Sequence, residues 1–279
     1  MTEDNIVRDE LGLKLDVTDV IEKPPSIILY GVSGSGKSSE MARAFPNCLF
    51  VQTNATVLRP YQTFLDANPD IAEKEGLKMP NRVTIPKVHP VSGEPLDPRP
   101  SMQTILDKYT AASKAGINPY DGIIFDEWTE LSFRCFEAIQ ADPQYGKNNY
   151  ARIDAIKELH YQLAALPQHT NSVLGLVCHE LEPVFDMAGE LSPTKGRLRY
   201  RGGPRMAVKS LTHEISSAMD IVLRILIEDD ITGQASERSY ITDVRKEWIS
   251  KIRSFGLQPK EKLGLRRILA TAKYTLKGN

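Results

Sequence analysis

Apolar and polar positions along the chain follow two patterns. Short apolar runs such as SIILY (26–30) and GIIF (122–125) have the length and composition of buried strands. Between such runs, apolar residues recur at helical spacing, as at Ile153, Ile156 and Leu163. Strands that alternate with helices predict an α/β fold with a doubly wound, mostly parallel sheet flanked by helices.

The same patterns place the individual elements. Helices are predicted from 37, from 101 to Gly116, and from about 150. Five prolines between 86 and 100 predict a loop or an inserted hairpin there, so the core carries a small proline-rich insertion. The predicted strands lie within 27–31, 48–54, 82–88, 121–128, 172–178, 220–227 and 238–244.

The domain organisation follows from where these patterns begin and end. Residues 1–24 are predicted to be a polar lead-in that stops at two prolines, residues 25–255 the core, and residues 256–279 a basic C-terminal tail. The length of 279 residues suits one large α/β domain or two small ones.

Charge and hydropathy narrow the range of partners. The net charge is −1, so any affinity for nucleic acid must come from a local basic patch. The N-terminus is acidic and polar, unlike a signal peptide, and the apolar run IVLRILI is short and interrupted by Arg224. We therefore expect a cytoplasmic protein without a membrane partner.

A glycine-rich stretch, GVSGSGKS, stands between a predicted strand and a predicted helix. Gly31, Gly36, Lys37 and Ser38 match the pattern G-x-x-x-x-G-K-[S/T] of a phosphate-binding loop. Glycines let backbone N–H groups crowd around an anion, and the helix presents its positive end to the same anion. The predicted ligand is a nucleoside triphosphate, held by Gly31, Val32, Ser33, Gly34, Ser35, Gly36, Lys37, Ser38 and Ser39. Lys37 would reach the β- and γ-phosphates, and Ser38 would hold Mg²⁺.

Three further candidates end apolar strands. Asp126, after IIF, would hold Mg²⁺ together with Ser38, and Glu127 would polarise the attacking water. The alternative for this acidic pair is a helix cap and a first-turn charge. His179 ends the strand SVLGLVC and would sense the γ-phosphate, unless it is a structural histidine.

Two basic clusters lie in the C-terminal half. The stretch between Met187 and Ser210 contains six basic residues and one acidic residue. Alternating arginines with an aromatic side chain suit single-stranded nucleic acid; the alternatives are a solvated loop or an arginine that serves a neighbouring subunit. The candidates for nucleic-acid binding are Lys195, Arg197, Arg199, Tyr200, Arg201 and Arg205.

The second cluster is Lys251 and Arg253, two positions apart in KIRSFG. On a strand both would point to one side. They would stabilise charge on a γ-phosphate across a subunit interface, or else guard an exposed strand edge.

Together these motifs resemble the RecA-like ATPase superfamily. The chain is most similar to the phage-encoded small RecA-like ATPases linked to single-strand annealing and recombination. The resemblance spans about 25–255 and rests on GVSGSGKS, AFPNCLFVQT, YDGIIFDEWTEL, LGLVCHE and DIVLRI. It implies Mg-dependent, DNA-stimulated ATP hydrolysis in the host cytoplasm, and a homo-oligomeric ring or filament in which Lys251 and Arg253 act in trans. The arginines after His179 would correspond to the DNA-binding loops.

The chain also departs from the RecA pattern. RecA carries its catalytic glutamate on an earlier strand, whereas Glu127 directly follows the metal-binding aspartate, as in AAA+ proteins. Alternative functions are a DNA packaging or translocation motor, a small-molecule P-loop kinase with the arginine-rich loop as a lid, and a nucleotide switch that does not hydrolyse.

Overall fold

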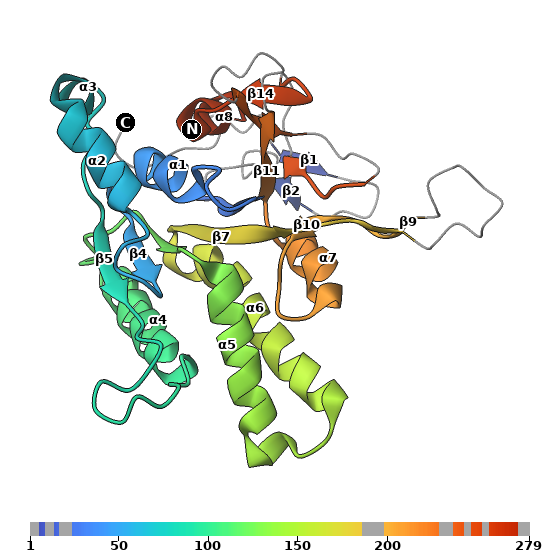
Figure 1. Ribbon diagram of the computed structural model, residues 1–279. Coiled ribbons are helices and arrows are strands. Elements are labelled where there is room, and N and C mark those ends of the chain that lie inside the picture. The colour runs from blue at the N-terminus through green and yellow to red at the C-terminus, as the bar shows by residue number, and fades with distance from the viewer. Residues whose placement is uncertain are drawn as a thin grey trace.

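A computed structural model describes residues 6–8, 14–16, 24–185, 198–228, 237–242, 247–252 and 257–272. One large sheet forms its centre, with the strand order β14-β12-β11-β3-β7-β6-β4-β5 (Figure 1). These strands are β3 (Ser26–Gly31), β4 (Leu49–Gln52), β5 (Asn81–Thr84), β6 (Gly122–Phe125), β7 (Val173–Leu181), β11 (Ile221–Glu228), β12 (Glu237–Ile241) and β14 (Lys260–Lys262). Two short strands extend the pairing, since β10 (Gly203–Pro204) pairs with β7 and β13 (Lys251–Ile252) pairs with β11.

The strands from β11 to β5 in this order run parallel to their neighbours, and β12, β14, β10 and β13 pair antiparallel. The central strands are buried along their whole length, which explains their continuous apolar sequences. Parallel strands need crossover helices, and the chain supplies them between most consecutive strands.

Helices cover both faces of the sheet (Figure 1). One face packs against α4 (Arg99–Lys114), α5 (Trp128–Ala141), α6 (Asn149–Thr170) and α7 (Lys209–Ala218). The other packs against α1 (Lys37–Ala44), α2 (Arg59–Ala67) and α8 (Leu265–Thr271). The predicted doubly wound, mostly parallel sheet flanked by helices is therefore confirmed.

Smaller elements complete the description. The short helix α3 (Pro69–Lys74) follows α2, and a 3₁₀ turn spans Pro143–Tyr145. Within the predicted N-terminal lead-in, β1 (Ile6–Arg8) and β2 (Lys14–Asp16) form an antiparallel ribbon. None of the helices in the described ranges is long and apolar enough to cross a membrane.

The proline-rich insertion at 86–100 is a hairpin-like loop. Val88 and Pro95 form an antiparallel bridge, and the His89 N–H donates to the Glu94 carbonyl over 2.8 Å. The Arg134 guanidinium on α5 donates to the Pro86 and Leu96 carbonyls, which ties the two ends of the loop together. The helix begins at Arg99, so the last residues of this stretch belong to α4.

The prediction of a basic tail after 255 is wrong for 257–272. Lys260–Lys262 pairs with β12, and Leu265, Ile268 and Leu269 of α8 are buried against α1. The Glu40 carboxylate on α1 accepts hydrogen bonds from the backbone N–H groups of Gly264 and Leu265 at the start of α8. Apolar positions between the basic residues thus make this segment part of the core.

Candidate active site

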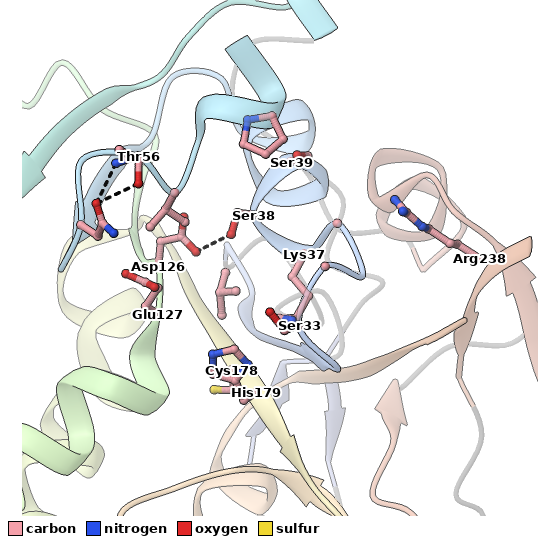
Figure 2. A pocket seen from close by; sticks show the side chains of 16 residues that line it. Ser33, Lys37, Ser38, Ser39, Thr56, Asp126, Glu127, Cys178, His179 and Arg238 are labelled. Carbon is pink, nitrogen blue, oxygen red and sulfur yellow. Dashed lines mark hydrogen bonds between the residues drawn. The ribbon is translucent and has the colours of Figure 1, made fainter. Parts of the chain in front are cut away.

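A cavity of about 460 Å³ lies at the carboxyl ends of the parallel strands, where α/β sheets bind their ligands. Its walls come from the β3–α1 loop, the segment after β4, the end of β6, the end of β7, and β12 (Figure 2). Residues as far apart in the sequence as Ser33 and Arg238 therefore share one site.

The β3–α1 loop has the backbone that its glycines predict. Gly34 and Gly36 have φ angles of +77° and +92°, in the left-handed region that favours glycine. A Cβ on Gly31 would lie 2.7 Å from the Ile225 carbonyl oxygen, so β11 passes too close for any side chain. Gly36 is the N-cap of α1 and offers no side-chain cap, which leaves the first N–H groups of the helix available to an anion.

Lys37 is buried in this loop. Its Nζ donates to the carbonyl oxygens of Gly31 at 3.0 Å and Val32 at 2.7 Å. Burial lowers its pKa from the usual value, and the nearby Asp126 carboxylate opposes that shift. The ammonium is thus held at the centre of the loop by neutral acceptors, where a phosphate would be a stronger partner.

Ser38 and Asp126 meet across the cavity. The Ser38 hydroxyl donates to Asp126 Oδ1 over 2.7 Å, and the Asp126 side chain is fully buried. Burial raises the pKa of Asp126 to about 6, although hydrogen bonds from Ser38 and Gln52 favour its charged form. A buried carboxylate beside a hydroxyl fits Mg²⁺, which prefers oxygen ligands, and these two side chains would hold it. When bound, the ion would neutralise charge on the phosphates.

Glu127 follows in an unusual backbone conformation. Its φ and ψ are 65° and 39°, a left-handed geometry that costs a non-glycine residue about 1 kcal/mol or more. The Thr53 hydroxyl donates to Glu127 Oε2 from the end of β4. This turn directs the carboxylate into the cavity and lets α5 begin directly behind it.

His179 reaches the cavity from β7, and a ring of hydrogen bonds fixes its backbone. Its N–H donates to Thr129 Oγ1 over 2.9 Å, and the Thr129 hydroxyl donates to the Arg205 carbonyl, also over 2.9 Å. The Arg205 N–H donates to the His179 carbonyl over 2.8 Å, which closes the ring. Partial burial and the Lys37 charge lower the pKa of His179, which favours the neutral imidazole.

The comparisons with known proteins agree with this geometry. The family described as AAA domain matches residues 23–254, which is most of the chain. The chain belongs to that family. The match includes every residue that lines the cavity.

Two solved structures are similar to the chain at low sequence identity. A KaiC-like protein from Pyrococcus horikoshii is 13% identical, with 89% of this chain and 93% of that chain covered and a TM-score of 0.40. The flagellar accessory protein FlaH from Methanocaldococcus jannaschii is 14% identical, with 93% and 95% covered and a TM-score of 0.38. None of the curated proteins compared with the chain matches it. The AAA domain match agrees with the P-loop nucleotide-binding site that the motifs indicated.

Not every candidate residue of this AAA domain lies at the cavity. Lys251 pairs with Val222 near the amino end of β11. The phosphate-binding loop lies toward the other end of the strands, after Gly31, which pairs with Ile225. The Lys251 Nζ donates to the Ser217 carbonyl over 2.8 Å and to the Met219 carbonyl, beside the C-terminal end of α7. Arg253, Lys195 and Arg197 lie outside the described residues, and so any action of Lys251 and Arg253 across an interface stays a prediction.

Sequence reasoning missed three parts of the site. Thr53 ends a strand just as Asp126 does, so the same rule would have found it. Asn54, Thr56 and Pro60 line the cavity from the following loop without any motif. Arg238 enters from β12, and only the register of the sheet shows that it reaches the phosphate-binding loop.

Proposed function

We propose that the chain hydrolyses ATP with Mg²⁺ and acts on single-stranded DNA, which stimulates the hydrolysis, in phage recombination, annealing or replication within the host cytoplasm. The observation that carries the proposal is the hydrogen-bonded ring of Thr129, His179 and Arg205. It joins His179, at the nucleotide site, to Arg205, near the end of the basic cluster between Met187 and Ser210.

The hydrolytic chemistry follows from the residues at the cavity. The phosphate-binding loop and Lys37 would hold the phosphates, and Glu127 would accept a proton from the attacking water. The water oxygen bonds to the γ-phosphorus as the bond from that phosphorus to the β–γ bridging oxygen breaks, giving ADP and phosphate. The neutral His179 side chain would donate to a phosphate oxygen.

The basic cluster between Met187 and Ser210 follows β7 in the sequence, and its later part returns to β7 through β10. After β7, the chain passes through β8 (Val184–Phe185) and returns through β9 (Leu198–Tyr200), which pairs antiparallel with β8. This ribbon projects from the body of the molecule, as Figure 1 shows for β9. Arg199 lies on β9, and β10 then pairs with the end of β7 at Glu180 and Leu181. A ligand bound along this ribbon would therefore affect the position of β7, the strand that carries His179.

The described side chains of this segment suit a nucleic-acid strand. Arg201 and Arg205 are exposed, and the Tyr200 side chain is 40% exposed. The Arg205 guanidinium lies over the Phe133 ring, 5.3 Å from its centre. Cationic groups beside aromatic rings bind a phosphate backbone and stack on bases without strong sequence preference.

The proposed homo-oligomer rests on the segment 247–252. The Trp248 ring packs on the Arg224 guanidinium, whose centre lies 3.5 Å from the ring centre, and Arg224 Nε donates to Glu180 Oε2 over 3.1 Å. Glu180 is next to His179. The segment that leads to Arg253 is therefore attached to the strand that would sense the nucleotide, and we propose that Arg253 and Lys251 act on the nucleotide of a neighbouring subunit in a ring or filament.

ATP turnover with single-stranded DNA, with duplex DNA and without DNA, at two salt concentrations, tests the proposal. Stimulation by single strands that weakens as salt rises is the expected result. Stimulation by duplex DNA alone would favour a packaging or translocation motor. Turnover that ignores DNA would favour a kinase, and the absence of turnover a nucleotide switch.

Two sets of variants locate the effects. Arg201→Ala with Arg205→Ala should reduce DNA affinity and flatten its salt dependence, whereas Lys108→Ala removes one exposed positive charge from α4 and should change neither. Arg253→Ala should hydrolyse poorly and recover activity when mixed with Lys37→Ala chains, since a mixed interface in one of its two orientations pairs an intact loop with an intact Arg253. Failure to recover at every mixing ratio would contradict action across an interface.

A further inference from the structure

Arg238 reaches the phosphate-binding loop through the register of the sheet. β12 pairs antiparallel with β11, so that Arg238 lies opposite Ile227. Gly31, the last residue of β3, lies opposite Ile225 on the other side of β11. Arg238 is therefore two residues beyond the end of β3, at the level where the loop leaves the sheet.

The side chain points to the face of the sheet that carries α1. Alternate residues of a strand share a face, so Arg238 lies on the same side as Tyr240. The Tyr240 hydroxyl donates to Glu40 Oε2 of α1 over 2.6 Å, which identifies that side as the one covered by the loop and its helix. A Cβ built on Gly36 would lie 3.1 Å from Arg238 Nη1, so the guanidinium is next to the start of α1.

This position has no neutralising partner in the described part of the chain. Among the residues that the structure describes, no hydrogen bond or ion pair holds the exposed Arg238 guanidinium. The carboxylates at the cavity, Asp126 and Glu127, lie on the other side of Lys37 and already accept hydrogen bonds (Figure 2). Arg238, Lys37 and the positive end of α1 thus place three like charges around one space.

We propose that Arg238 binds the α- and β-phosphates of the nucleotide in the same chain. The proposal rests on the nucleotide binding in the proposed function, and it needs no DNA and no second subunit. The guanidinium is on the wall opposite Asp126 and Glu127, which places it away from the γ-phosphate that these carboxylates would serve. An anion between Arg238 and Gly36 would neutralise the excess positive charge and accept charge-assisted hydrogen bonds.

Calorimetric titration of the full chain without DNA tests this role, with MgADP, a non-hydrolysable ATP analogue with Mg²⁺, and pyrophosphate as separate ligands. Arg238→Ala should weaken all three by a similar factor of about ten to a hundred, because one charge-assisted contact is lost. Arg238→Lys should retain part of the affinity. Thermal unfolding of the unliganded Arg238→Ala variant should match the wild type, since the guanidinium has no described partner to lose.

Lys108→Ala serves as the charge-matched control, because it removes one exposed positive charge from the opposite face of the sheet. Unchanged affinity of Arg238→Ala for MgADP would overturn the proposal. Loss confined to the ATP analogue would place the guanidinium at the γ-phosphate, and unchanged pyrophosphate binding would place it at the base; either result also overturns it. Because no DNA is present, failure of DNA to stimulate turnover would count against the proposed function and leave this assignment intact.

Discussion

The two halves of the sheet on either side of β3 contribute to the site by different means. The half that contains β7, β6 and β4 is parallel, and the carboxyl-terminal parts of its strands carry His179, Asp126 and Thr53, of which Thr53 donates to Glu127. The half that contains β12 and β14 is antiparallel beyond β11 and supplies a single described side chain to the cavity, Arg238.

The difference shows two ways to place a side chain at a shared edge. Parallel strands that all end at one edge bring their next residues together, so a motif after a strand is enough to predict a site. The antiparallel strand β12 begins, rather than ends, at this side of the sheet. Arg238 near its start is positioned by the pairing of β12 with β11. The parallel half is therefore readable from local sequence, and the antiparallel half depends on tertiary structure.

Replacing Lys37 should have the largest effect on the parallel half. Lys37→Ala removes the ammonium that Gly31 and Val32 hold in the loop, and we expect steady-state ATP turnover to fall by about a thousandfold. Lys114→Ala, on the exposed end of α4, is the control and should keep wild-type turnover. Substantial turnover in Lys37→Ala would place the chemistry elsewhere.

Glu127→Gln should separate binding from hydrolysis. The amide cannot accept the proton of water, so single-turnover hydrolysis should slow by about a hundredfold while ATP affinity stays near the wild-type value. Glu130→Gln, one turn further along α5, should leave the rate unchanged. Equal rates in the two variants would remove Glu127 from the reaction and leave it as the residue that starts α5.

A third variant tests how firmly the antiparallel half is attached. Glu40→Ala removes the acceptor for Tyr240, Gly264 and Leu265, and leaves the buried Tyr240 hydroxyl unpaired. We expect the free energy of unfolding in urea to fall by about 2 kcal/mol. Glu73→Ala, at an exposed position of α3, should change it little. An equally small effect at Glu40 would mean that α8 is held by apolar packing alone.

The smallest predicted effect is a pH dependence of the free energy of unfolding, caused by the buried His160 on α6. Burial lowers the pKa of His160 to about 4, whereas an unfolded chain has the usual value near 6.5. Below pH 6.5 the unfolded state binds more protons, so this residue makes stability fall as the pH drops toward 4. Between pH 7.5 and 5.5 the wild type should lose about 1 kcal/mol more than His160→Leu, measured by urea unfolding. Parallel stability curves for the two proteins would contradict this.

Local sequence predicted the elements that belong to the parallel half. The runs before Gly31 and Asp126 are strands that are apolar on both faces, and the glycines after the first run mark the turn from β3 into α1. Prediction failed where polar residues separate the apolar ones. In 257–272, Leu265, Ile268 and Leu269 are spaced for one helical face, but the surrounding lysines and arginines suggested a tail.

Arg238 shows why the remainder of the site could not be predicted. Its neighbours Glu237 and Ser239 form no motif with it, and the glycine that it approaches is about two hundred positions away. Only the pairing of β12 with β11, and of β11 with β3, relates the two. Thr53 differs, because its position at the end of a strand is visible in the sequence.

The hydrogen bonds between Glu40 and the start of α8 have a consequence for protein synthesis. The helix that begins at the phosphate-binding loop is made early, yet part of its cover is residues 257–272. During translation, part of the apolar side of α1 therefore stays uncovered until residues 257–272 have left the ribosome. Packing of the helix that begins at the phosphate-binding loop is therefore completed late in synthesis.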